Sequence, residues 1–162
     1  MGDGVEEFWR EFCAVSGTDP ATRHDVYAFG DSPALSDELL ELVLNGPKRA
    51  TAGLVVEYER AGDPLPEAGT LSVVLDGAGR PRCVLRTTQV QVAPLGSVDA
   101  AFAHDEGEGD RSLEWWRAAH ERYFRRALPA MGIPLDGVDL WALDCVFERF
   151  ELCWVRPARS ST

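Results

Sequence analysis

The residue types best suited to chemistry lie in the segment Gly46-Pro47-Lys48-Arg49-Ala50-Thr51. In a tight turn, an amine and a hydroxyl three residues apart can come within hydrogen-bond reach. A lysine can lose its proton in a protein, which an arginine cannot, and a threonine hydroxyl beside a neutral amine is a known nucleophile arrangement. Lys48 and Thr51 are therefore candidates for a base and a nucleophile. The alternative interpretation is a solvated turn with one cation.

The choice of basic residues favours a special role for this amine. Lys48 is the only lysine in the chain, and the other fifteen basic residues are arginines. Such usage is typical of a GC-rich genome, which encodes arginine wherever a positive charge is sufficient. A lysine that persists against this bias suggests a need for a primary amine, although one surface lysine can also survive by chance.

A second candidate is the acidic run from His104 to Asp110, which reads HDEGEGD. Its carboxylates could supply a general acid or base, or could bind Mg²⁺. The spacing does not fit an EF-hand loop. Crowding of like charges could raise the pKa of one carboxyl group, as happens in catalytic acids, but a solvated acidic loop before a helix is the simpler interpretation.

A third group of residues combines aromatic side chains with arginines in the predicted helix 112–127. Aromatic rings beside arginines can stack on bases, whereas at helical spacing they more often belong to a core. We expect His120 to be a hydrogen-bonded histidine of the core or its rim, and not a metal ligand. The sequence contains no CxxC pair and no GxSxG elbow, so neither a zinc knuckle nor a Ser-His-Asp hydrolase is indicated.

The apolar spacing predicts the elements that carry these residues. We expect helices over 5–15, from Pro33 to about residue 45, and over 112–127, with a connection over 18–31. Strands are predicted over 51–59, 70–76 and 82–92, a hairpin turn at Asp76-Gly77, and a short helical turn over 98–104. Residues 105–110 are predicted as a loop, and residues 138–155 as two β-runs. Helices followed by short mixed strands predict an α+β fold.

Length and composition indicate one globular domain. The chain has 162 residues, of which 45% are hydrophobic and 27% charged, with a net charge of −11. We expect a cytoplasmic protein, because no secretory signal or membrane-length apolar stretch occurs and the four cysteines fit buried thiols in a reducing compartment. The negative charge argues against binding of long duplex DNA, which depends on phosphate neutralisation.

Four motifs occur together in one order and resemble the bacterial ASCH-domain proteins. They are AFGDSP (28–33), NGPKRATAGL (45–54), GTLSVVLDGAGRPRCVLRTTQV (69–90) and FAHDEGEGDRSLEWWRAAHERYF (102–124). The resemblance implies a PUA-like mixed β-barrel with flanking helices. We expect a single domain over 1–162, with its core over about 24–155 and the helix 5–15 packed on it.

The resemblance also implies function, through two branches of the family. One small branch removes the acetyl group of N4-acetylcytidine with a Lys, a Thr three positions later and a Glu before a helix. These match Lys48, Thr51 and Glu106 as catalytic residues, with Glu108 competing for the last place. Other members are described as ribonucleases. We therefore expect a hydrolase without a cofactor, or alternatively a ribonuclease acting on single-stranded RNA with Mg²⁺ or Mn²⁺.

A third class is a non-catalytic binding module for single-stranded RNA or a modified nucleoside. Its partners would include neither a membrane nor a long duplex, and protein partners are not indicated. Lys48, Arg49 and Arg86 would form a small positively charged patch at the base of a pocket, and aromatic side chains beside it would stack on bases. The predicted substrate-binding residues are Phe29, Arg49, Arg86, Glu108, Ser112, Trp115 and Tyr123.

Overall fold

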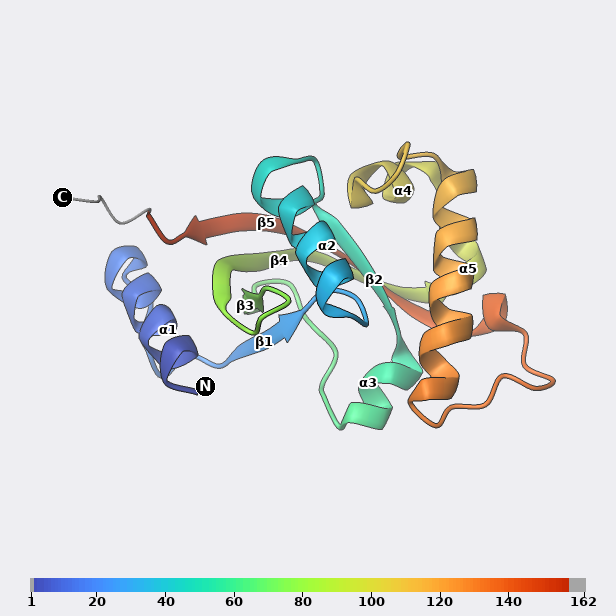
Figure 1. The fold of residues 1–162 in the computed structure, drawn as a ribbon, viewed down its shortest axis with the longest axis horizontal. Coiled ribbons are helices and arrows are strands. Elements are labelled where there is room, and N and C mark those ends of the chain that lie inside the picture. The colour runs from blue at the N-terminus through green and yellow to red at the C-terminus, as the bar shows by residue number, and fades with distance from the viewer. Residues whose placement is uncertain (1, 158–162) are drawn as a thin grey trace. The chain divides into compact units, whose positions relative to one another are not determined.

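The computed structural model describes residues 2–157, and they form an α+β fold, as predicted (Figure 1). Hydrogen bonds join five strands into one mixed sheet in the order β1-β3-β4-β5-β2. The described residues group into two compact units. One consists of residues 2–46, 69–87 and 151–157, and the other of residues 47–68 and 88–150. The prediction of a single domain over 1–162 stays a prediction, and the two units are described separately.

The first unit contains two helices and the strands β1 and β3. α1 (Gly2–Ser16) and α2 (Pro33–Asn45) flank β1 (His24–Ala28), which runs parallel to β3 (Leu71–Leu75). β1 lies inside the span predicted as a connection, because its five residues carry little apolar alternation. The core of this unit joins one face of α1 to β3 and the start of β4, through Phe8, Trp9, Phe12, Cys13, Leu71, Val73 and Val84.

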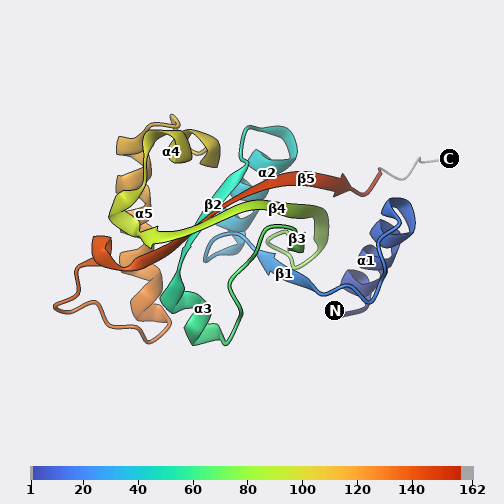
Figure 2. The same ribbon diagram turned by 180° about the vertical axis from the view of Figure 1, so that it is seen from behind.

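The second unit contains the residues that the sequence singles out for chemistry. β2 (Ala50–Leu54) pairs antiparallel with β5 (Asp144–Val155), and β4 (Pro81–Pro94) continues into this unit. α4 (Ala100–Glu106) and α5 (Leu113–Ala130) lie beside each other, as both ribbon views show (Figure 2). Their apolar faces share a core with β2 and β5 that includes Phe102, Trp116, Phe124 and Phe147.

Three of the predicted element boundaries are wrong. Residues 55–61 form the helix α3 (Val55–Ala61) instead of extending the strand, since Glu57 accepts a hydrogen bond from the Leu54 backbone and Gly62 ends the helix in the left-handed conformation. α4 continues through Glu106, so the acidic loop begins only at Gly107. Residues 144–155 form one strand and not a pair of β-runs.

Among the described residues, no helix combines the length and apolar character that a bilayer crossing requires. Three cysteines are buried and Cys153 is half-buried, and all four are free thiols, as the sequence predicts.

Candidate active site

Lys48 is buried in the second unit between carboxylates that the sequence places far from it. Its side chain is 1% exposed, and its Nζ donates hydrogen bonds of 2.8 Å to Glu108 Oε2 and 2.8 Å to the Ala50 carbonyl. Glu106 Oε1 lies 3.5 Å from the same Nζ. This set of acceptors suits a protonated ammonium group, which has three donors and no acceptor. These contacts favour the ammonium form of Lys48, and its role as a base stays a prediction.

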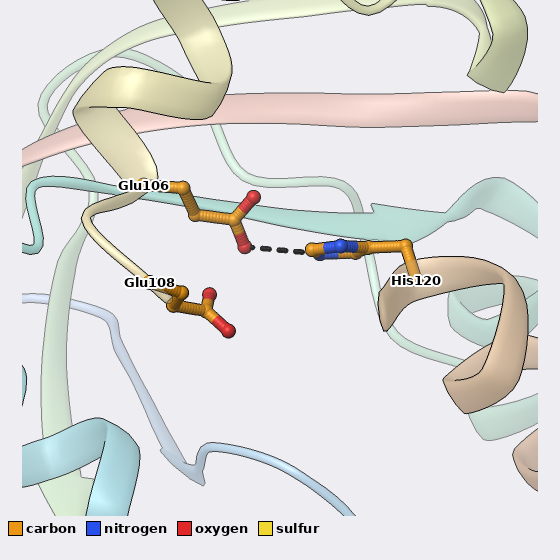
Figure 3. Close-up of side chains that lie close together, drawn as sticks. All are labelled: Glu106, Glu108 and His120. Carbon is orange, nitrogen blue, oxygen red and sulfur yellow. Dashed lines mark hydrogen bonds and ion pairs between the residues drawn. The ribbon is translucent and has the colours of Figure 1, made fainter. Parts of the chain in front are cut away.

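Two side chains of α5 contact the Glu106 carboxylate, one at each oxygen. Oε2 accepts a hydrogen bond from the Trp116 indole, and Oε1 lies at hydrogen-bond distance, 3.2 Å, from His120 Nε2 (Figure 3). Burial opposes ionisation of Glu106, yet the positive charges of His120 and Lys48 hold its pKa well below the usual range. The surroundings of Glu106 thus favour its ionised form.

Glu108 has the opposite electrostatic character. Burial raises its pKa above the usual range, and although the Lys48 charge opposes this shift, the neighbouring Glu106 carboxylate adds to it. Its side chain is 13% exposed, against 3% for Glu106. Two carboxyl groups whose surroundings drive their pKa values apart are the usual sign of divided acid–base roles. Glu108 is thus the better candidate for moving a proton.

His120 and Trp116 complete the group, which we call the Lys48 cluster: Lys48, Glu106, Glu108, Trp116 and His120. The two rings lie one helical turn apart on α5 and stack with centroids 3.7 Å apart and planes 14° apart. Burial disfavours the charged imidazole, but the charge and hydrogen bond of Glu106 outweigh it and raise the pKa of His120 above its ordinary value. The expectation of a buried, hydrogen-bonded histidine is confirmed.

The ligand-type atoms of Glu106, Glu108 and His120 lie within 4.8 Å of one another. The amine of Lys48 lies among them, at 2.8 Å from one carboxylate. A divalent cation entering there would meet an ammonium group at close range, which costs several kcal/mol of Coulomb energy at an effective dielectric constant of about 20. We therefore interpret these residues as an ion-pair network.

The loop that carries Glu108 is shaped by two glycines in the left-handed conformation. Gly107 ends α4 at φ 70°, and a Cβ there would lie 2.8 Å from Lys48 Cα. Gly109 has φ 59°, and a Cβ there would overlap the Trp115 ring, which covers this part of the loop. Ser112 then caps α5 by accepting a hydrogen bond from the Trp115 backbone. These close approaches fix Glu108 beside Lys48.

The segment that carries Lys48 is tied to the end of α4 by the backbone. Arg49 N–H donates to the Asp105 carbonyl at 2.9 Å, and the Arg149 guanidinium pairs with the Asp105 carboxylate at 3.0 Å. The Arg49 guanidinium donates to the Lys48 carbonyl at 2.6 Å. Arg49 therefore helps to hold the turn.

Thr51 follows the peptide group that Lys48 contacts, but it faces away from the core. Ala50 and Leu54 pack in the core of the second unit, so the alternation of β2 directs Thr51 to the other face, where it lies across from Glu148. Thr51 is half-buried, and its hydroxyl makes no hydrogen bond within residues 2–157. Its role as a nucleophile stays a prediction.

The remaining predicted binding residues are placed as follows. Tyr123 lies on α5 against Phe124, with the Arg126 guanidinium over its ring. Phe29 and Arg86 belong to the first unit: Phe29 is buried with its ring edge-on to Tyr27, and Arg86 pairs with Glu151 at 3.0 Å. Their binding roles stay predictions.

Two members of the cluster, Trp116 and His120, were not predicted as site residues. Their spacing of four places them on one face of α5, and this was the available signal. The sequence alone does not show that Glu106, at the end of another helix, meets that face.

Comparisons with known proteins give one family-model match and two similar crystal structures. Residues 25–153 match the family model described as ASCH domain. A crystal structure of protein EF3133 from Enterococcus faecalis V583, of family DUF984, is 31% identical, with 94% of this chain and 90% of that chain covered and a TM-score of 0.82. A crystal structure of an ASCH domain from Lactobacillus crispatus JV V101 is 29% identical, with 91% and 92% covered and a TM-score of 0.75. No curated protein sequence matches. The match to these structures confirms the predicted fold class.

Proposed function

Since the chain belongs to the ASCH-domain family, we propose that it binds single-stranded RNA or a modified nucleoside and hydrolyses an N-acyl group of the N4-acetylcytidine type. The observation that carries this proposal is the Lys48 cluster. A buried ion-pair network contributes little net stability compared with apolar packing, and strongly shifted carboxyl pKa values gather at functional sites.

The proposed reaction assigns one task to each group. The Thr51 hydroxyl attacks the acetyl carbon while Glu108 takes the hydroxyl proton, and Lys48 stabilises the oxyanion that forms on the carbonyl oxygen. The bond from carbon to N4 then breaks as Glu108 returns the proton to N4, which releases cytidine. Water, deprotonated by Glu108, then attacks the acetyl ester of Thr51. The bond from the acyl carbon to the Thr51 oxygen breaks as Glu108 returns the proton to that oxygen, and the acetic acid released ionises to acetate in water.

Glu108 is also the member of the ion-paired trio through which a substrate would reach Lys48. The Lys48 and Glu106 side chains are 1% and 3% exposed, against 13% for Glu108. In the proposed function, the acyl oxygen takes the place of the Glu108 carboxylate on Lys48 Nζ. Glu108 is thereby released for proton transfer.

The experiment follows conversion of N4-acetylcytidine to cytidine by chromatography. We expect turnover by the wild type, with a loss of at least about 100-fold in Lys48→Met and Glu108→Gln. Arg10→Met, which removes a cation from an exposed ion pair on α1, is the control and should retain full activity. EDTA should have no effect. Absence of turnover in the wild type, or equal turnover in Lys48→Met, would contradict the proposal.

Thr51 needs a test of its own, because it faces away from the core. Thr51→Ser should keep turnover and Thr51→Ala should lose it, since only the first retains a hydroxyl. Full activity in Thr51→Ala would assign the attack to water instead.

A ribonuclease is the second candidate, because cleavage of RNA by its own 2′-hydroxyl needs the same kinds of group: a proton acceptor and a cation for the phosphate. Glu108 and Lys48 supply them at 2.8 Å from each other. Cleavage of a labelled single strand that disappears in Lys48→Met, with no release of cytidine from N4-acetylcytidine, would favour this reaction.

A further inference from the structure

The His120 ring directs both of its nitrogens toward oxygen atoms. Nδ1 lies 2.9 Å from the Trp116 carbonyl, and Nε2 lies 3.2 Å from Glu106 Oε1. A carbonyl oxygen can only accept, so Nδ1 carries a hydrogen. Glu106 accepts from the Trp116 indole and lies 3.5 Å from the Lys48 amine, and both contacts favour its ionised form. An ionised carboxylate can only accept, so Nε2 carries a second hydrogen, and a ring with hydrogens on both nitrogens is an imidazolium.

The surroundings of His120 favour this charge. Three charged groups of the cluster belong to other segments: Glu106 at the end of α4, Glu108 in the following loop, and Lys48 before β2. The carboxylate in direct contact with the ring is Glu106, which the Lys48 ammonium also approaches at 3.5 Å. On its flat side, the ring stacks on the Trp116 indole at 3.7 Å, and the face of an indole attracts a cation.

The two α5 side chains also fix the direction of the Glu106 carboxylate. The Trp116 indole occupies Oε2 and His120 occupies Oε1. Glu106 is therefore anchored, and the oxygen shared with His120 is the one turned toward Lys48 Nζ. A shift of His120 would let Glu106 turn, and Lys48 would lose one of the two carboxylates between which it lies.

We propose that His120 is a positioning residue of this site: an imidazolium that, with Trp116, fixes Glu106 so that Lys48 is held facing Glu108. The catalytic consequence rests on the proposed function, whereas the charge state and the hydrogen bonds of His120 can be measured without any substrate.

The substrate-free test is NMR of ring ¹⁵N-labelled histidine, with the His120 signal assigned by its loss in His120→Gln. Both ring nitrogens should report an imidazolium at pH 7 in the wild type, and a neutral ring should appear in Glu106→Gln. A neutral ring in the wild type would overturn the proposal, since it would place the shared proton on Glu106. An imidazolium that persists in Glu106→Gln would also overturn it, because another group would then hold the charge.

The kinetic test uses two variants that each keep one hydrogen bond. His120→Gln can place a donor near the Nε2 position and so reach Glu106, whereas His120→Asn keeps a donor near the Nδ1 position and cannot reach Glu106. We expect kcat to fall by about 100-fold in His120→Asn, by less in His120→Gln, and KM to change little in either. Equal losses in both folded variants, or a loss confined to KM, would overturn the positioning role. A wild type without turnover would contradict the proposed function alone, and the NMR result would still decide the inference.

Discussion

Glu106 and Glu108 are two residues apart in the sequence, yet their surroundings shift their pKa values in opposite directions. Glu106 faces both His120 and Lys48 and accepts from an indole, whereas at Glu108 burial and the neighbouring Glu106 carboxylate outweigh the pairing with Lys48. The sequence identified both as alternatives for one role. Only the positions of Lys48 and His120 distinguish the carboxyl group with the lowered pKa from the one with the raised pKa.

Removal of Lys48 should destabilise the protein because it leaves buried carboxylates without their cation. We expect Lys48→Met to lower the free energy of unfolding by about 3–5 kcal/mol. The double variant Lys48→Met with Glu108→Gln should recover part of this loss, since the second change removes one stranded charge. Denaturant unfolding of the single and double variants measures the coupling, and strictly additive losses would show that the Lys48–Glu108 pair is not formed.

His120 should make stability depend on pH in a defined direction. A group whose pKa is raised in the folded state stabilises fully below its unfolded pKa, about 6.5 for histidine, and this contribution is lost as the pH rises through the raised folded value. The difference in unfolding free energy between the wild type and His120→Gln should therefore be larger at pH 6 than at alkaline pH.

The same comparison in a Glu106→Gln background gives the control for this pH dependence. Without the Glu106 carboxylate, His120 loses the main cause of its raised pKa. The difference in unfolding free energy caused by His120→Gln should therefore vary much less with pH in this background. A pH dependence of the same size in both backgrounds would mean that Glu106 is not the cause.

Among the helices and strands, those with a strong apolar periodicity could be predicted from the sequence. Those that depend on a single contact could not. The helices at 5–15 and 112–127 were predicted from their apolar spacing. Residues 55–59 have the β-branched and aromatic content of a strand, but Glu57 caps a helix there. β1 is a short strand whose existence depends on its pairing with β3, far along the chain.

The turn at Gly107 should be the local feature on which the site depends most. Gly107 and Gly62 both end helices of the second unit, at φ 70° and 72°, but only a Cβ at Gly107 would strike the Lys48 backbone. Gly62→Ala should cost about 1–2 kcal/mol of stability, the usual strain of the left-handed conformation. Gly107→Ala should cost about 1–3 kcal/mol more from overpacking, as thermal or denaturant unfolding would measure. Equal costs would show that the close approach to Lys48 does not exist in solution.

For the whole molecule, the net charge of −11 limits how a polyanion can bind. The long-range field repels nucleic acid, so only a local positive site can hold a strand. The proposed binding should therefore involve few phosphates. The net charge follows from composition alone, whereas the placement of the Lys48 cluster depends on the fold.

The affinity for a labelled single-stranded RNA should depend only weakly on salt. The slope of the logarithm of the binding constant against the logarithm of the salt concentration should correspond to about one to three phosphate contacts. Duplexes of the same length should bind much more weakly. Titration by fluorescence anisotropy at several salt concentrations measures both. A steep slope or tight duplex binding would indicate an extended basic surface that this account does not contain.

In the proposed function, Lys48 is a buried ammonium group that receives the substrate's acyl oxygen in place of Glu108. Because Lys48 is the only lysine in the chain, ¹⁵N-lysine labelling gives a single side-chain signal that can be followed by NMR without assignment. In Thr51→Ala, which should bind without turnover, we predict that this signal is that of an ammonium protected from solvent exchange and that N4-acetylcytidine shifts it in a saturable way. A rapidly exchanging signal in the free protein, or a signal that does not move although the nucleoside binds, would contradict the account.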